Sequence, residues 1–278
     1  MTKTADRCVS VNGVVFGNDE PLALIAGPCV IEDAALTVRI ARKLSAIARA
    51  RRMPFVFKAS YDKANRSSIK SYRGPGLRQG LDILRRVKDE VGCPVLTDVH
   101  WKEDVRDVAR VVDILQVPAF LSRQTDLLLA CAMTGRTVNV KKGQFLSPWD
   151  MEHAVRKLES TGNRNILLTE RGASFGYNNL VVDMRSLAVM KQWGYPVIYD
   201  ATHSVQLPGA LNGASGGQRE FVIPLARAAV ALGVAGLFCE VHPDPDQALS
   251  DGPNNLALTA VPSFLKTVQT FDKVAKNI

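Results

Sequence analysis

Four side chains of types that bind transition metals stand far apart in the sequence, each at or just beyond the end of a short apolar run. They are one thiol, one imidazole and two carboxylates: Cys29, His203, Glu240 and Asp251. Such a mixed set suits a divalent ion of borderline softness, for example Zn²⁺, Fe²⁺, Mn²⁺ or Co²⁺. The chain has no CxxC or HExxH motif, so spacing alone leaves a metal site and the ordinary packing of a buried cysteine equally open.

Basic side chains occupy similar places at the ends of other apolar runs. Strand alternation puts Lys58 on the same face as Val56 and Lys141 on the same face as Asn139, with Lys142 on the opposite face. Further basic residues, together with hydroxyl donors, are Lys63, Arg66, Ser67, Ser68, Arg123 and Arg171. If they converge on one rim, these groups could bind more than one phosphate or carboxylate. The alternative is a set of solvated surface charges.

The elements that would position these residues form one repeating pattern. Short apolar runs, predicted as strands, occupy 22–29, 54–60, 93–100, 113–120, 137–143, 165–172, 196–203 and 236–242. Amphipathic stretches between them, predicted as helices, include 34–52, 76–91, 125–133, 148–160 and 220–232. Strands that alternate with helices favour a parallel sheet, and eight strands close a (β/α)8 TIM barrel, whose strand ends meet at one face. A doubly wound open sheet is the alternative, although no GxGxxG motif is present.

The first residues follow a different pattern. Residues 7–18 alternate, and the Asn12-Gly13 pair is a strong hairpin signal. No linker or shift in composition divides the remaining sequence. We therefore expect one α/β domain over residues 1–278, with a hairpin in 1–20 and the barrel in 21–278.

Composition excludes several classes of protein. The 278 residues carry a formal charge of +8, and 46% of them are hydrophobic, which excludes a disordered chain. No apolar run is long enough to cross a membrane, no secretion signal is visible, and the five cysteines are scattered, so we expect a cytoplasmic protein with reduced thiols. Aromatic residues make up 6% and do not interleave with the basic ones. The charge therefore suits small anions better than nucleic acid.

Several longer motifs point to one family. FKASYDKANRSS, SYRGPGL, LQVPAFLSRQTDLL, NVKKGQF, TERGASFGYNNLVVDMR, DATHSVQLPG, SGGQREF and EVHPDPDQALSDGPN closely resemble the 3-deoxy-D-manno-octulosonate 8-phosphate synthase family. The resemblance extends from about Leu22 to Asp251. The related 3-deoxy-D-arabino-heptulosonate 7-phosphate synthases carry a KPRTS-type motif where this chain has KANRSS in residues 63–68.

The resemblance implies a transferase with a (β/α)8 barrel, usually a homotetramer. Its reaction condenses phosphoenolpyruvate with D-arabinose 5-phosphate and water in the biosynthesis of the lipopolysaccharide sugar KDO. The enzyme alternative is the seven-carbon synthase, which uses erythrose 4-phosphate. The non-enzyme alternative is a barrel that binds polyanions without catalysis.

The resemblance also assigns roles to residues at the strand ends. For phosphoenolpyruvate it implies Lys58 and Lys63 at the carboxylate and substrate oxygens, and Lys141, Arg171, Gln116 and Ala119 at the phosphate. For the aldose phosphate it implies Asn65, Arg66 and Ser67 at the phosphate, Asp98 at the sugar, and Arg123 reaching a neighbouring subunit's site. Lys58, Lys63, Asp98 and Lys141 are the expected catalytic residues.

The family contains metal-requiring and metal-free classes, distinguished mainly by Cys or Asn at the position of Cys29. Here Cys29, His203, Glu240 and Asp251 all match the metal-requiring pattern. The resemblance thus favours the metal site over simple packing of the thiol.

Overall fold

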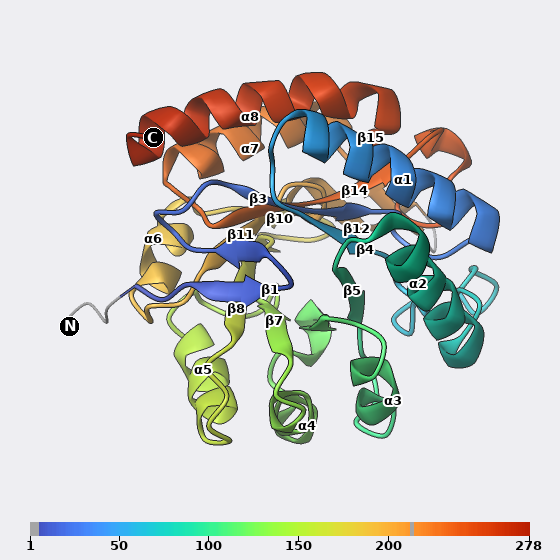
Figure 1. Ribbon diagram of the computed structural model, residues 1–278, viewed down its shortest axis with the longest axis horizontal. Helices are drawn as coiled ribbons and strands as arrows, with labels where there is room; N and C mark the ends of the chain where they lie inside the picture. Colours follow the sequence, from blue (N-terminus) through green and yellow to red (C-terminus); the bar gives the residue numbers. More distant parts are fainter. Residues whose placement is uncertain (1–5, 212–213) are drawn as a thin grey trace.

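Eight parallel strands form a closed barrel in the computed structural model, which describes residues 6–211 and 214–278 (Figure 1). In order around the barrel they are β3 (Ala23–Gly27), β4 (Phe55–Lys58), β5 (Val95–Asp98), β6 (Ile114–Val117), β7 (Thr137–Lys141), β8 (Ile166–Glu170), β11 (Val197–Asp200) and β14 (Gly236–His242). Strand β14 pairs with both β11 and β3, which closes the ring. The predicted (β/α)8 barrel is confirmed, and the open-sheet alternative is wrong.

Helices surround this barrel on the outside (Figure 1). They are α1 (Ala34–Ala50), α2 (Leu77–Val91), α3 (Val105–Ala109), α4 (Thr125–Met133), α5 (Met151–Glu159), α6 (Arg185–Lys191), α7 (Val222–Ala231) and α8 (Val261–Lys276). The five stretches predicted as helices coincide with α1, α2, α4, α5 and α7. Local signals set their ends: Asp33 caps α1 by accepting a hydrogen bond from the Leu36 amide, and Gly92 ends α2 in the left-handed conformation.

The hydrophobic core has two layers, as expected for strands that are buried on both faces. The outer layer lies between strands and helices, and includes Leu24, Phe57, Leu115 and Cys239. The inner layer fills the barrel with side chains from alternate positions of the same strands: Ile25, Val56, Leu96, Ile114, Leu167, Ile198 and Phe238. Side chains therefore fill the interior of the barrel below the carboxyl ends of its strands.

The predicted N-terminal hairpin is confirmed and covers one end of the barrel (Figure 1). Its strands are β1 (Val9–Val11) and β2 (Val14–Phe16), joined by Asn12 and Gly13, both at positive φ. The buried side chains of the hairpin join the inner core layer, and Asn12 Nδ2 donates to Asp113 Oδ1 at 2.8 Å. The hairpin thus closes the end at which the strands begin and leaves the opposite end open.

Additional elements surround the open end. Two small antiparallel pairs are β9 (Ala173–Ser174) with β10 (Leu180–Val181), and β12 (Gln206–Leu211) with β13 (Ala214–Gly217). Strand β15 (Leu256–Ala257) pairs in parallel with the end of β14. Short 3₁₀ turns occupy Ala119–Leu121, His203–Val205, Arg219–Phe221, Pro245–Gln247, Gly252–Asn254 and Leu258–Ala260. Among the helices that the structure describes, none combines the length and the apolar character that a membrane span requires.

Candidate active site

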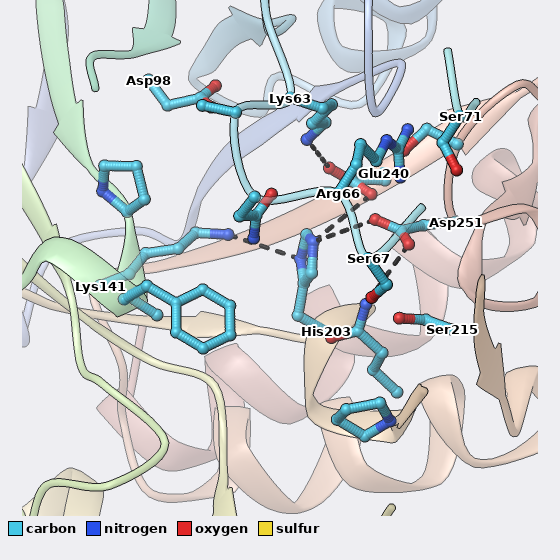
Figure 2. A pocket seen from close by; sticks show the side chains of 18 of the residues that line it. Lys63, Arg66, Ser67, Ser71, Asp98, Lys141, His203, Ser215, Glu240 and Asp251 are labelled. Atoms are coloured by element: carbon cyan, nitrogen blue, oxygen red, sulfur yellow. Dashed lines mark hydrogen bonds and ion pairs between the residues drawn. The ribbon is translucent and has the colours of Figure 1, made fainter. Parts of the chain in front are cut away.

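A cavity of about 670 Å³ opens at the carboxyl end of the barrel strands. Most of the predicted site residues line it: Lys58, Lys63, Asn65, Arg66, Ser67, Asp98, Gln116, Ala119, Lys141, Arg171, His203, Glu240 and Asp251 (Figure 2). Cys29 is buried just beside this wall, in contact with Asp251. The convergence that strand parity predicted is therefore present in the folded chain.

The four candidate metal ligands come together at one side of this cavity. The ligand atoms of Cys29, Glu240 and Asp251 all lie within 4.8 Å of one another. His203 is not a member of that tight group, but its Nε2 lies 3.6 Å from Glu240 Oε2 and 3.8 Å from Asp251 Oδ2 (Figure 2). Thiol, imidazole and two carboxylates thus surround a single position, although they come from distant parts of the sequence.

Two observations show that this donor set fits a divalent cation. Glu240 Oε2 is buried without a hydrogen-bond partner and faces His203, which is costly unless something positive completes it. Burial and the neighbouring carboxylate of Glu240 raise the pKa of the Cys29 thiol well above its ordinary value. A cation bound here would displace that proton and relieve both penalties, because metals bind the thiolate form.

Local backbone features place two of these ligands. Gly27 ends β3 two residues before Cys29, and a Cβ there would lie 1.9 Å from the carbonyl oxygen of Lys58. Only glycine therefore lets β3 approach the end of β4 so closely. Asp251 has φ of 50°, in the left-handed region that side chains other than glycine adopt at a cost.

Two lysines flank Glu240. Lys58 is almost fully buried, and its Nζ donates to Glu240 Oε1 at 2.7 Å and to the Cys29 carbonyl at 2.8 Å. Lys63 Nζ lies 3.8 Å from the same carboxylate oxygen (Figure 2). Burial alone would lower the pKa of Lys63, but Cys29, Glu240 and Asp98 raise it more, so the ammonium form is favoured. Positive charge is thus held at the floor of the cavity.

A third lysine is paired with Asp200, a residue at a predicted strand end to which sequence reasoning assigns no role. Lys141 Nζ donates to Asp200 Oδ2 at 2.5 Å, and that oxygen also lies 2.8 Å from His203 Nδ1. Burial alone raises the pKa of Asp200, but His203 and Lys141 lower it more, to well below its usual range. Lys142 points away from the cavity, as strand alternation predicts, and its Nζ donates to the carbonyls of Leu146 and Gly172.

Arg171 lines the cavity and has an unused donor. Its Nη2 donates to Gln206 Oε1 at 2.9 Å, while Nη1 is buried without a partner. Gln206 in turn donates to Asp251 Oδ1 at 3.3 Å. Burial lowers the pKa of Arg171 but leaves an arginine protonated at any ordinary pH. An anion beside Arg171 would complete its hydrogen bonding.

A second cationic region lies on the loop between β4 and α2. Arg66 Nε donates to the carbonyl of Tyr72 at 3.0 Å, and Arg66 Nη2 is buried without a partner. Nearby on the cavity wall, Asp98 Oδ2 lies 3.0 Å from His100 Nε2. Burial raises the pKa of Asp98, but His100 and Lys63 lower it more, to well below its usual range.

Comparison with known proteins shows which family this chain belongs to. The family model described as "DAHP synthetase I family" matches residues 4–277. The chain belongs to the DAHP synthetase I family. Among its relatives, a "2-dehydro-3-deoxyphosphooctonate aldolase" from Pelobacter propionicus is 61% identical over 97% of this chain and 99% of its own length. Proteins of the same name from Geotalea daltonii and Geobacter sulfurreducens are 59% and 57% identical, over 96% and 97% of this chain and 98% and 99% of theirs.

These relatives confirm the resemblance that the motifs carried. The eight-carbon sugar acid phosphate in their name is the product class that the motifs predicted, and it separates them from the seven-carbon branch. Within the DAHP synthetase I family fold, the residue roles implied by the motifs stay predictions for this chain. The relatives are named as enzymes, which favours catalysis over a polyanion-binding barrel.

Arg123 lies apart from the rest of this DAHP synthetase I family site. It is exposed and does not line the cavity; its backbone carbonyl accepts a hydrogen bond from Lys157. Sequence reasoning places Asp200 and His100 at the ends of predicted strands but assigns neither a role, and it does not consider Gln206 or Ser250. The structure places Asp200 beside Lys141 and His203, and His100 beside Asp98. Gln206 contacts Arg171 and Ser250 contacts Cys29, and nothing in the sequence indicates these two contacts.

Proposed function

We propose that this protein condenses phosphoenolpyruvate with D-arabinose 5-phosphate and water, giving 3-deoxy-D-manno-octulosonate 8-phosphate and inorganic phosphate. The observation that carries the proposal is the presence of two arginines, Arg171 and Arg66, each with a buried unpartnered donor in one cavity. Two phosphorylated substrates require two such sites, and guanidinium groups bind phosphate with two parallel hydrogen bonds. The names of the relatives supply the substrate class.

Phosphoenolpyruvate is assigned to the side of the cavity that holds Lys141 and Arg171. In our proposal these two cations bind its phosphate, with Gln116 and Ala119 beside them on the wall. Lys63 and Lys58 bind the carboxylate and neighbouring substrate oxygens. Lys58 is already paired with Glu240, so its main effect is to fix that carboxylate and to add positive charge beneath the substrate.

Arabinose 5-phosphate is assigned to the loop between β4 and α2. Arg66, Asn65 and Ser67 bind its phosphate, and Asp98 faces its sugar end. The aldehyde carbon then lies toward C3 of phosphoenolpyruvate. A cavity that holds both reactants in this way overcomes their mutual repulsion and the entropic cost of bringing them together.

The reaction requires one carbon–carbon bond and the addition of one water molecule. C3 of phosphoenolpyruvate attacks the aldehyde carbon, whose oxygen becomes an alkoxide, and positive charge develops at C2. Water adds at C2 and gives up two protons, one to the new alkoxide and one to the departing phosphate, whose bond to C2 breaks to leave the keto group. The ionised carboxylate of Asp98 stabilises the positive charge, and the cationic groups stabilise the departing phosphate. The low pKa of the Asp98 carboxyl keeps it charged for this purpose.

Cys29, His203, Glu240 and Asp251 hold a divalent ion in this proposal, either Zn²⁺, Fe²⁺, Mn²⁺ or Co²⁺. When bound, such an ion polarises the aldehyde oxygen and orients the sugar. Asp200 Oδ2 accepts a hydrogen bond from His203 Nδ1–H and so leaves the Nε2 lone pair free to bind the ion. Ser250 Oγ, 2.7 Å from Cys29 Sγ, adds a hydrogen bond to the sulfur.

We also infer a homotetramer in which Arg123 serves a neighbouring cavity. Its exposure and its position outside its own cavity support this role. Phe120, three residues earlier, is exposed yet lines the cavity mouth, where a second subunit would cover it. Light scattering would give the mass of the assembly, and an Arg123→Ala chain mixed with an Arg171→Ala chain should recover activity if the sites are shared.

The test of the proposed function is phosphate release from phosphoenolpyruvate, combined with elemental analysis of the purified protein. Release should require arabinose 5-phosphate, stop after chelation and return when a divalent ion is added. Cys29→Ala should abolish the return, whereas Cys131→Ala, a buried thiol in the outer core layer, should preserve it. Activity that survives complete removal of metal would contradict the assigned metal site, and no phosphate release with arabinose 5-phosphate would contradict the reaction.

A further inference from the structure

Cys29 and Asp251 are 222 positions apart in the chain, yet their side chains meet at 3.2 Å. Cys29 follows β3, whereas Asp251 belongs to the segment between β14 and β15. That segment contains two 3₁₀ turns and no α-helix or strand. Regular backbone hydrogen bonds therefore do not fix Asp251 relative to Cys29, and particular side chains must do so.

Glu32 makes the connection from the side of Cys29. It lies three residues after Cys29, and its Oε1 accepts a hydrogen bond from the Leu249 amide at 3.0 Å. The same oxygen lies 3.5 Å from Nε2 of His242, the last residue of β14. The Glu32 side chain is 14% exposed, whereas Leu249 is 50% exposed, so the contact lies at the edge of the buried site. One carboxylate thus joins the Cys29 loop, the end of β14 and the Asp251 segment.

The Asp251 segment is fixed on its other side as well. Asn255 Nδ2 donates to the carbonyl of Ser250 at 3.2 Å, and the amides of Asn254 and Asn255 donate to the carbonyl of Asp251. Asp251 itself has the left-handed backbone noted above. A residue in this region persists when its surroundings determine its conformation. From the N-terminal side the segment is held by Glu32, through the Leu249 amide, and by Ser250, whose Oγ lies 2.7 Å from Cys29 Sγ.

We propose that Glu32 is a positioning residue for the metal site, an inference that rests on the proposed function of Cys29 and Asp251 as ligands. By holding the Leu249 amide, Glu32 sets where Asp251 lies against Cys29. Without that contact the segment would gain freedom, and ordering it again would consume part of the binding free energy of the metal. Residues that orient metal ligands commonly contribute 10- to 100-fold in affinity.

The substitution Glu32→Ala removes the contact without removing a ligand. Tyr72 Oη donates to the backbone carbonyls of Ile31 and Glu32, at 3.0 and 3.2 Å. These bonds involve main-chain oxygens, so they survive a change of the Glu32 side chain. The loop that carries Arg66 therefore keeps its attachment, and the effect of the substitution is directed at the Asp251 segment.

The experiment measures Co²⁺ binding to the metal-free full-length protein, through the absorption of the thiolate–cobalt bond and competition with a chelator. Glu32→Ala should raise the dissociation constant about 10- to 100-fold. Glu32→Gln keeps an oxygen that can accept from Leu249, so its affinity should stay within about 3-fold of the original. Glu90→Ala, which breaks surface pairs with Arg42 and Arg86, is the control and should bind as the unchanged protein does.

The measurement distinguishes an error in the proposed metal site from an error in the proposed role of Glu32. If the unchanged protein binds no Co²⁺, the metal site is wrong and the role of Glu32 falls with it. If the unchanged protein binds Co²⁺ and Glu32→Ala binds it equally well, the metal site stands and the role of Glu32 is overturned. An affinity of Glu32→Gln as low as that of Glu32→Ala also overturns the hydrogen-bond argument. Should Glu32→Ala not fold, Leu249→Pro removes the donor instead and should weaken binding similarly.

Discussion

The ammonium of Lys141 lies 2.5 Å from Oδ2 of Asp200, and this oxygen is also the partner of His203 Nδ1. Asp200 is fully buried at the end of β11. One carboxylate therefore connects a lysine assigned to phosphate binding with an imidazole assigned to the metal. Asp200 can therefore affect both phosphate binding by Lys141 and metal binding by His203 without contacting a substrate.

The substitution Asp200→Asn changes the shape of the side chain very little, but it should impair catalysis because it removes the negative charge. The new side chain would present a neutral amide where the ammonium and the imidazole both need an acceptor. We expect kcat/KM for phosphoenolpyruvate to fall about 10- to 100-fold, and the free energy of unfolding to fall by about 3–5 kcal/mol as a buried pair loses its charge. Steady-state kinetics and urea unfolding check both. The exposed Asp183→Asn is the control, and equal kinetics for the two variants would contradict the role.

The two arginines should separate the two substrates. Hydrogen bonds to a charged group contribute about 1.5–3 kcal/mol, equivalent to about 10- to 100-fold in affinity. Arg66→Ala should therefore raise the KM for arabinose 5-phosphate by that factor and leave the KM for phosphoenolpyruvate nearly unchanged. Arg171→Ala should do the reverse. Varying each substrate in turn measures the effect, and a rise of both KM values together in each variant would argue against separate sites.

The hairpin at the opposite end of the barrel should contribute to stability but not to substrate binding. Phe16 is fully buried in the inner core layer, whereas the adjacent Val15 is 37% exposed. Phe16→Ala should lower the free energy of unfolding by about 3–5 kcal/mol, and Val15→Ala by less than about 1 kcal/mol. Chemical denaturation compares the two. Similar losses for both variants would mean that the hairpin does not pack as described.

The pH dependence should reveal the environment of Asp98. Its folded pKa lies well below the ordinary value because His100 and Lys63 outweigh the effect of burial. The stability that the ionised carboxylate contributes is therefore complete above the unfolded pKa and is lost as the pH falls through the folded pKa. His100→Leu removes a partner, so the pKa of Asp98 should rise and the acid limb of kcat/KM for arabinose 5-phosphate should move to higher pH. An acid limb that stays in place or moves lower would contradict this.

Sequence reasoning predicted what depends on local periodicity. Apolar runs indicated the strands, and alternation correctly separated the inward Lys58 and Lys141 from Lys142, which is directed away from the cavity. It could not reveal which groups meet across the barrel. The contacts of Lys58 with Glu240 and of Lys141 with Asp200 join residues 182 and 59 positions apart.

Contacts at such separations depend on strand order, barrel closure and loop geometry, for which a single sequence carries no local signal. The Lys58 pair also changes an expectation. This lysine was predicted to bind substrate, but the folded chain already gives it two partners, Glu240 and the Cys29 carbonyl. Part of the positive charge predicted for the rim is therefore balanced within the protein.

The most direct test of the proposed reaction compares two aldose phosphates in the same assay. Phosphate release from phosphoenolpyruvate is measured with D-arabinose 5-phosphate and with D-erythrose 4-phosphate, and the sugar acid product is identified by its mass. We predict a kcat/KM at least about 100-fold higher for arabinose 5-phosphate, and an eight-carbon product. A preference for erythrose 4-phosphate, with a seven-carbon product, would contradict the proposal.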